Sequence, residues 1–285
     1  MSAEGPSEPA GCGALSVAVV RGGPAREHDV SVASGAAVSE ALRGAGVTVA
    51  DLLVDRRGCW TCGTEAADHA GRPGPRGAAL RALEGADVAF LALHGPWGED
   101  GSVQGLLETL GVPYTGSGVL ASALAMDKGR TKEVLAHHGV RTPPWVDVAA
   151  PAWRSERAGI TARLRDLPGP WVVKPARDGS SFGVRLVDRG DDLPAALDEA
   201  LAEPGARVLV ERRVAGTEVT CPVLGNAGSA LETLPLIEIV PRGRDFFDFE
   251  AKYQGASEEI CPARVDERVA ATVRALALIA HSVLA

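Results

Sequence analysis

The sequence predicts an α/β domain built on a parallel sheet, followed by an α+β region. Three observations carry this prediction. Between residues 14 and 95, short apolar runs alternate with stretches of helical spacing, which is typical of parallel strands joined by crossover helices. The TPPW segment (142–145) interrupts this pattern, because proline disfavours a helix at its own position and at the one before it. The apolar runs that follow are longer and suit an antiparallel sheet.

The N-terminal elements are expected to end at turn residues, with glycines that suit helix C-caps. The expected strands are ALSVAVVRGG (14–23), VTVADLLV (47–54) and DVAFLALHG (87–95), and the expected helices are SVASGAAVSEALRGAG (31–46), RGAALRALEG (76–85), SVQGLLETLG (102–111) and two segments within VLASALAMDKGRTKEVLAHHG (119–139). Ligands of parallel sheets lie beyond the carboxyl ends of the strands, where Gly22, Gly23 and His94 fall.

The second half of the chain is expected to form a sheet whose loops clasp a ligand. The expected strands are PWVVKPA (170–176), GVRLVD (183–188), RVLVERRV (207–214), TEVTCPVLG (217–225) and LPLIEIV (234–240), with one helix among them, DDLPAALDEALAEPG (191–205), and an amphipathic helix at the end, DERVAATVRALALIAHSVLA (266–285).

Composition argues against nucleic-acid and membrane partners. The 29 Lys and Arg residues against 37 Asp and Glu residues give a formal net charge of −8, so an anionic ligand needs a local cationic cluster. No run approaches the ~20 apolar residues of a membrane span. Residues 1–13 read as a disordered tail and not as a secretory signal, and five cysteines suit a reducing compartment, so a cytoplasmic location is expected. The CWTC segment (59–62) could be a redox pair or half a zinc site, with His69 nearby. Because it lacks a second ligand pair and is expected to lie in a Gly- and Arg-rich connection between elements, a role without such chemistry is favoured.

Two loops that follow strands carry candidate binding residues. GGPAREHDVSVASG (22–35) offers Ser31 or Asp29 as a helix cap, but capping does not explain Glu27, whose carboxylate could receive a substrate ammonium. HGPWGEDGSVQG (94–105) adds His94, which by itself is more often structural than catalytic.

A second group of residues suits a nucleotide. VVKPARDGSSFGVRLV (172–187) places Lys174 before a glycine-serine loop and a strand after it, so it is either a turn or a hairpin closing over phosphates, unlike a helix-opening phosphate loop. Lys128, Arg130 and Lys132 form either a solvated basic face or a polyphosphate site. Glu211 and Glu218 favour hydrogen bonds to a base and a ribose over metal binding. DFFDFEAKYQG (245–255) resembles a lid that carries Lys252 and Tyr253.

These pieces, in this order, resemble the D-alanine:D-alanine ligase family of the ATP-grasp superfamily. The matching blocks are GGPAREHDVSVASG (22–35), HGPWGEDGSVQGLLETLGVPYTGSGVLASALAMDK (94–128), VVKPARDGSSFGV (172–184), VLVERRVAGTEVT (208–220) and DFEAKYQ (248–254). The resemblance implies an N-terminal substrate-binding α/β domain (14–117) and an ATP-grasp pair of a central (118–213) and a C-terminal (214–285) subdomain, the last one incomplete.

The resemblance also implies an activity and a role for each residue. ATP would phosphorylate the carboxylate of one D-alanine, and the amine of a second would attack the acylphosphate to form D-alanyl-D-alanine for peptidoglycan. The implied catalytic residues are Glu27, Ser180, Lys252 and Tyr253; Glu27 would hold the ammonium group of the first D-alanine, and His94 would lie near the substrates. The implied contacts to the ATP phosphates are Lys128, Lys174, Ser180, Ser181 and Lys252. Glu211 and Arg212 would contact the adenine, and Glu218 the ribose.

The sequence departs from the family at its end. Family members continue into a segment whose acids and asparagine hold magnesium or manganese, so the metal ligands are expected beyond Ala285 and this chain is expected to be inactive or nearly so. Two alternatives stay open: a non-catalytic nucleotide-binding relative, and a ligase that takes D-serine or D-lactate second. Of the possible second substrates, Tyr253 favours D-alanine. The implied partners are D-alanine and ATP, and a homodimer is compatible with the resemblance.

Overall fold

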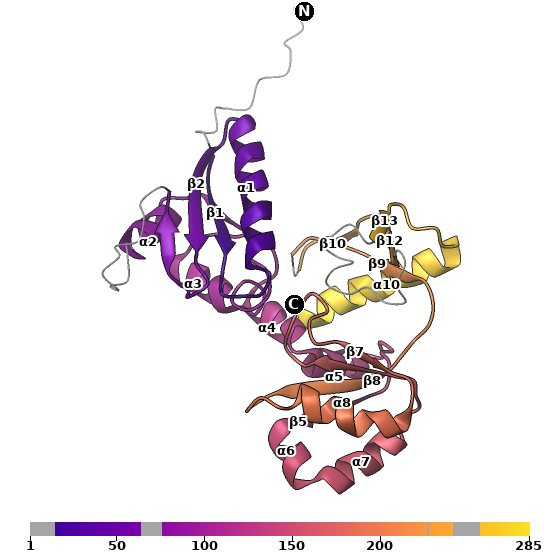
Figure 1. Cartoon of the computed structure of the whole chain (residues 1–285). Coiled ribbons are helices and arrows are strands. Elements are labelled where there is room, and N and C mark those ends of the chain that lie inside the picture. Colours follow the sequence, from indigo (N-terminus) through magenta and orange to yellow (C-terminus); the bar gives the residue numbers. More distant parts are fainter. Residues whose placement is uncertain (1–14, 64–75, 227, 242–256) are drawn as a thin grey trace, which may run out of the picture. The chain divides into compact units, whose positions relative to one another are not determined.

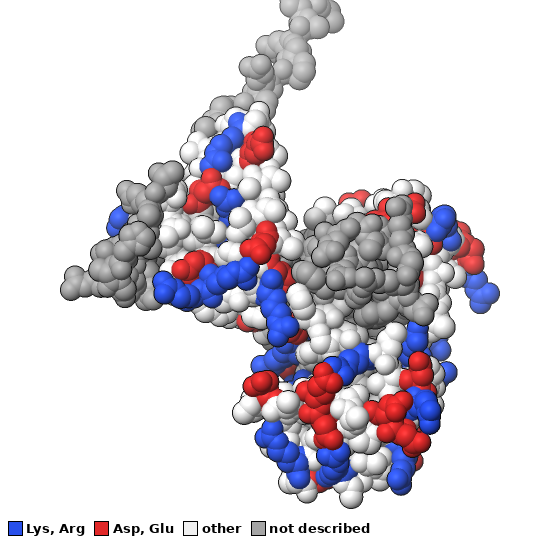
Figure 2. Space-filling view, viewed as in Figure 1, with Lys and Arg blue, Asp and Glu red and all other residues white. Residues whose placement is uncertain are grey.

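The computed structural model describes residues 15–63, 76–226, 228–241 and 257–285. The chain divides into two units, residues 1–119 and 120–285. Figure 1 shows a sheet with its helices in each unit. On the face seen in Figure 2, acidic and basic side chains are interspersed over both units. No helix in the described part of the chain has the length and apolar character needed to cross a bilayer.

The first unit contains the predicted parallel sheet. Its strands are β1 (Ser16–Gly22), β2 (Thr48–Val54), β3 (Trp60–Cys62) and β4 (Val88–Leu91), in the order β3-β2-β1-β4. β1 pairs in parallel with both β2 and β4, which confirms the prediction. β3 pairs antiparallel to β2, and it falls on the CWTC segment that was expected to be a connection. Three residues are too few to show a strand pattern in the sequence.

The helices of this unit are α1 (His28–Gly44), α2 (Arg76–Glu84) and α3 (Ser102–Leu110). The central strand β1 is buried along residues 17–20, as expected for a strand covered on both faces. A core of aliphatic side chains joins the sheet to α2 and α3, and it includes Ala18, Val20, Leu52, Leu83 and Leu107. This rigid layer fixes the strand ends from which the candidate loops leave.

The second unit contains an antiparallel sheet of four strands. They are β5 (Trp145–Ala149), β6 (Trp171–Pro175), β7 (Arg185–Val187) and β8 (Arg207–Arg212), in the order β5-β8-β6-β7. A short 3-10 turn, η1 (Gly190–Asp192), precedes the helix α8 (Leu193–Ala200), which ends five residues before the predicted boundary. α6 (Ala150–Ser155) and α7 (Arg157–Arg165) were not predicted.

One face of this sheet carries the core of the unit. Trp153, Ile160, Leu164 and Leu197 pack there with Val173 and other strand valines. Figure 1 places α6, α7 and α8 along this sheet. The cavity described below is lined by other residues of the same strands, so the core supports its floor.

The remaining elements of the second unit are α4 (Val119–Met126), α5 (Lys128–His137), β9 (Glu218–Thr220), β10 (Val223–Leu224), β11 (Glu232–Thr233), β12 (Ile237–Pro241), β13 (Ser257–Ile260) and α10 (Glu267–Leu284). β13, β12 and β9 form one antiparallel sheet, and β10 pairs with β11. The predicted strand 217–225 is therefore two strands, because Pro222 between them has no N–H to donate. The boundary at residues 213 and 214 stays a prediction.

Candidate active site

Glu27 lies in the loop that leaves the carboxyl end of β1, directly before α1. Its side chain is only 2% exposed, and within the described residues its Oε2 atom has no hydrogen-bond partner. The neighbouring loop presses against it: a Cβ atom on Gly95 would lie 3.0 Å from Oε2, and the φ of Gly95 is +65°. A buried carboxylate with an unused oxygen is suited to a cationic group of a ligand.

Ser31 ties the two loops of the first unit together. Its hydroxyl accepts a hydrogen bond from the Gly22 N–H (2.8 Å) and donates one to the Ala92 carbonyl (2.6 Å). The expectation that Ser31 or Asp29 caps α1 is therefore wrong, since no side chain caps this helix. Asp29 instead forms an ion pair with Arg56 (2.8 Å). The predicted meeting of the two loops at one sheet edge is confirmed by the Ser31 bridge.

The loop that carries His94 is ordered by its own acids. Asp100 accepts hydrogen bonds from the N–H groups of Trp97 and Ser102, both 3.0 Å, and Glu99 accepts one from the Gly95 N–H (2.8 Å). Burial would raise the pKa of Asp100, but these hydrogen bonds outweigh it and leave the pKa below its ordinary value. His94 is half-buried on this loop, three residues beyond β4.

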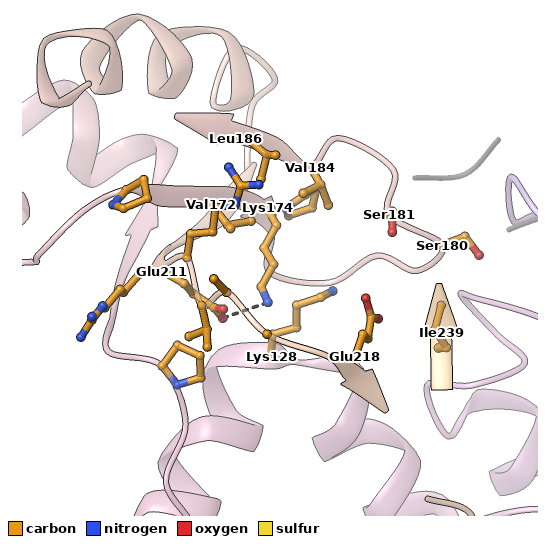
Figure 3. Close-up of a pocket in the computed structure, with 18 of the residues that line it drawn as sticks. Lys128, Val172, Lys174, Ser180, Ser181, Val184, Leu186, Glu211, Glu218 and Ile239 are labelled. Atoms are coloured by element: carbon orange, nitrogen blue, oxygen red, sulfur yellow. Dashed lines mark ion pairs between the residues drawn. The ribbon is translucent and has the colours of Figure 1, made fainter. Parts of the chain in front are cut away.

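The second unit contains a cavity of about 1560 Å³. Lys128, Lys174, Glu211 and Glu218 all line it, as do Ser180 and Ser181 of the loop after β6. Apolar side chains form part of its wall, among them Pro143, Pro144, Val172, Leu186 and Ile239. Figure 3 shows the Lys174 ammonium group joined by a dashed line to the Glu211 carboxylate, with the Lys128 side chain directed away from Glu211 and toward Glu218, and the serine loop farther along. An apolar wall with a few charged groups is typical of a small-molecule site.

Glu211 is held between two lysines. Its Oε1 atom lies 2.9 Å from the Lys174 Nζ atom and 3.2 Å from the Lys132 Nζ atom. The antiparallel pairing of β6 with β8 sets Val172 opposite Glu211, which brings Lys174 within reach. The Glu211 side chain is 8% exposed, so this ion pair is shielded from solvent.

Lys128 begins α5 and points into the cavity, where its ammonium group donates to the Asp178 carbonyl. Burial lowers the pKa of Lys128, and the positive charge of Lys174 lowers it further. Asp127 positions this turn: its carboxylate caps the helix at the Arg130 N–H (3.1 Å) and accepts hydrogen bonds from Arg177 (2.9 Å) and Arg207 (2.7 Å).

The serine loop adopts an unusual backbone. Ser180 and Ser181 have φ values of +49° and +58°, and Gly183 has +67°. Positive φ is uncommon outside glycine and costs on the order of 1 kcal/mol or more for each such residue. The Asp178 carboxylate accepts a hydrogen bond from the Gly179 N–H (2.9 Å), which helps hold the turn. A strained loop that faces a cavity is a common feature of ligand sites.

The structure brings most of the predicted residues together within their own units. Lys128, Lys174, Ser180, Ser181, Glu211, Arg212 and Glu218 all line the cavity of the second unit, whereas Glu27 and His94 belong to the first unit. Lys252 and Tyr253 lie outside the described residues. Across residues 15–63, 76–226, 228–241 and 257–285, no three His, Cys, Asp or Glu side chains gather into a group that could hold a metal ion.

One residue that shapes the site, Asp127, was not singled out from the sequence. Lys132 was predicted as part of a basic face or a polyphosphate site, and it instead pairs with Glu211. Asp127 carries the signal of an Asp directly before a helical run. The predicted triplet of cations separates, because Arg130 turns to the surface and pairs with Glu133 (2.6 Å).

Comparison with known proteins covers both units. A family model described as "D-ala D-ala ligase N-terminus" matches residues 16–117, and one described as "D-ala D-ala ligase C-terminus" matches residues 134–285. The crystal structure of the VanG D-Ala:D-Ser ligase from Enterococcus faecalis superposes with a TM-score of 0.75 at 28% identity, over 95% of this chain and 83% of that one.

Curated relatives are more similar in sequence than this solved structure. A D-alanine–D-alanine ligase of Desulforudis audaxviator is 44% identical over 269 residues, which are 94% of this chain and 79% of that protein. One from Cupriavidus taiwanensis is 42% identical over 269 residues, 94% of this chain and 74% of that protein. Since these matches span both units at well over 30% identity, this chain belongs to the D-alanine–D-alanine ligase family.

Proposed function

We propose that this chain joins two D-alanine molecules into D-alanyl-D-alanine at the expense of ATP. The observation that carries the proposal is its family membership across both units. An oxygen of the first D-alanine carboxylate attacks the γ-phosphorus of ATP, and ADP leaves. The amine of the second D-alanine then attacks the acylphosphate carbonyl, so that a C–N bond forms, phosphate leaves and a proton is released.

The cavity of the second unit is proposed to bind ATP. Lys128 and Lys174 supply positive charge for the phosphates, and the backbone amides of the serine loop supply donors. Lys174 pairs with Glu211 in this structure, so it would exchange that partner for phosphate oxygens when ATP binds. The apolar wall suits the base, with Glu211 and Arg212 at its edge and Glu218 at the ribose. Ser180, Lys252 and Tyr253 stay predictions as catalytic residues.

Glu27 is proposed to hold the ammonium group of the first D-alanine. Its buried Oε2 atom, unpartnered within the described residues, gives this role a physical basis, because a cation there would compensate a buried negative charge. His94 would lie beside the same substrate. Magnesium, a homodimer, a cytoplasmic location and the expected low activity of this chain stay predictions.

The test is product formation by the purified chain with ATP, MgCl₂ and D-alanine, followed as phosphate release and by mass spectrometry of the dipeptide. Lys174→Ala is expected to lower kcat/KM for ATP at least about a hundredfold, since it removes a charge that faces the phosphates. Arg185→Ala is the matched control: Arg185 lies on the adjacent strand β7, pairs with Glu199 and does not line the cavity. Undiminished activity of Lys174→Ala would refute the assignment of the loop.

D-Serine is a second candidate for the attacking amine, because the VanG D-Ala:D-Ser ligase has a similar fold. Supplying D-alanine with equimolar D-serine distinguishes the two. We expect D-alanyl-D-alanine as the main product. A majority of D-alanyl-D-serine would favour the second candidate, and ATP binding without either product would favour a non-catalytic relative.

A further inference from the structure

Lys132 is a buried lysine that does not line the cavity. It is 6% exposed, and its Nζ atom lies 3.2 Å from Glu211 Oε1 and 5.0 Å from the centre of the Trp145 ring. Burial lowers the pKa of Lys132, and the Glu211 carboxylate partly offsets that shift. Because the cavity wall does not include Lys132, this residue does not contact a ligand there directly, and its ion pair with Glu211 is its direct link to the cavity.

The two lysines on Glu211 differ in what they can do when a ligand arrives. Lys174 is 25% exposed and lines the cavity, so phosphate oxygens can draw it away. Lys132 is 8% exposed in its side chain and lies behind the carboxylate, where it has no competing partner in the cavity. A buried carboxylate that lost all its cations would be strongly destabilised. Lys132 is therefore the counter-ion that stays with Glu211 throughout binding.

The surroundings of Glu211 specify the ligand group that it would meet. Val172, Leu186 and Ile239 give the cavity an apolar wall suited to a flat ring. A carboxylate at the edge of that wall accepts hydrogen bonds from an exocyclic amino group and repels a carbonyl oxygen at the same place. Both lysines approach Oε1, which leaves the other oxygen, Oε2, for such an amino group.

We propose that Lys132 is a positioning residue that selects the adenine base, by fixing Glu211 so that its second oxygen accepts the 6-amino group. This inference rests on the proposed function only in requiring that the cavity binds a nucleotide. It assigns base selection to a residue that touches neither the base nor the phosphates.

Equilibrium binding to the full chain tests the proposal without catalysis. Calorimetric titrations compare ATP with purine riboside 5′-triphosphate, which lacks the 6-amino group, in a buffer that contains MgCl₂ and no D-alanine. A hydrogen bond to a charged acceptor corresponds to about tenfold to a hundredfold in affinity, so the wild-type protein should prefer ATP by that factor. Lys132→Met should reduce the preference for ATP to less than about threefold, mainly by weakening the binding of ATP. Arg130→Met is the control.

Arg130 lies on the same helix, two residues away, and its side chain is 60% exposed. The preference of Arg130→Met for ATP should equal that of the wild-type protein. An unchanged preference in Lys132→Met, or an equal loss for both nucleotides, would overturn the proposal, because a purely structural role weakens both alike.

A second variant and the wild-type protein itself provide further tests. If Lys132→Met does not fold, Lys132→Arg decides: a guanidinium takes both carboxylate oxygens, so the preference should fall, and a wild-type preference would overturn the proposal. A wild-type protein that binds neither triphosphate, or both equally, would also overturn it. A protein that prefers ATP but forms no dipeptide would instead refute the proposed function and leave this inference standing.

Discussion

Asp127 is the residue whose replacement tests most directly how the second unit positions Lys128. Its carboxylate is 1% exposed, caps α5 and contacts Arg177 and Arg207. Losing the cap costs about 1 kcal/mol. Losing the charge-assisted bond from Arg207 costs about 1.5 to 3 kcal/mol. The contact with Arg177, whose side chain is 70% exposed, adds less than about 1 kcal/mol.

Two substitutions separate these contributions. Asp127→Ala removes all three, with an expected loss of about 3 kcal/mol in the free energy of unfolding, or roughly 6 to 12 °C in Tm for a unit of this size. Asp127→Asn keeps a capping side chain and loses the charge, so about 2 kcal/mol is expected. Urea unfolding followed by tryptophan fluorescence is a suitable assay, because Trp145, Trp153 and Trp171 all belong to this unit.

The pH dependence supplies an independent check. The hydrogen bonds from Arg130, Arg177 and Arg207 outweigh burial and hold the pKa of Asp127 below its ordinary value. A lowered carboxyl pKa contributes stability that is present above the unfolded value of about 4 and is lost as the pH falls through the folded value. The difference between wild type and Asp127→Asn should therefore be constant above about pH 5 and shrink below about pH 4.

Glu133→Ala is the matched control, since Glu133 lies on the same helix in an exposed pair with Arg130. That variant should unfold within about 2 °C of the wild type. An Asp127→Ala protein that also unfolds within about 2 °C of the wild type would refute the reasoning, because it would show that neither the cap nor the arginine contacts stabilise the unit.

Gly129, Glu27 and Lys128 each offer a further test. Gly129→Ala should lower the free energy of unfolding in urea by about 1 to 3 kcal/mol, because the added Cβ atom would lie 2.5 Å from an Asp147 oxygen. Gly159→Ala should raise the free energy of unfolding by up to about 1 kcal/mol, because no atom lies within 4 Å of the added Cβ atom. Glu27→Gln should raise KM for D-alanine at least about tenfold, because the ammonium loses a buried counter-charge. ATP affinity should fall as the pH rises toward 10, earlier than for an ordinary lysine, because the pKa of Lys128 is lowered.

Each of these has a result that would contradict it. Equal stability of the two glycine variants would show that the helix shifts to admit a methyl group. An unchanged KM in Glu27→Gln, with Glu40→Gln on the exposed face of α1 as control, would remove the ammonium site. If ATP affinity still falls at alkaline pH in Lys128→Met, the fall is caused by a group other than Lys128.

The sequence by itself determined the fold class and most of the elements. Alternation of apolar runs and helical spacing identified β1, β2 and β4 and their crossover helices, because parallel strands buried on both faces leave a strong local pattern. The order of the sequence motifs, which is distinctive, also selected the seven predicted residues that line the cavity of the second unit. Three elements escaped prediction: β3 and α6 are too brief for periodicity to show, and α7 buries only Ile160 and Leu164, which leaves little apolar pattern in the sequence.

Only the tertiary structure decided which charges meet. Ser31 looked like a helix cap, but it bridges the ends of β1 and β4, a contact that spans 61 residues. Lys128, Arg130 and Lys132 looked like one basic cluster in the sequence. In the structure Arg130 turns to the surface, Lys132 pairs with Glu211, and Lys128 lines the cavity. Glu211 gained its two lysines from a helix and from the neighbouring strand. Ion pairs of this kind depend on burial and on distances between elements far apart in the chain, which no local pattern in the sequence encodes.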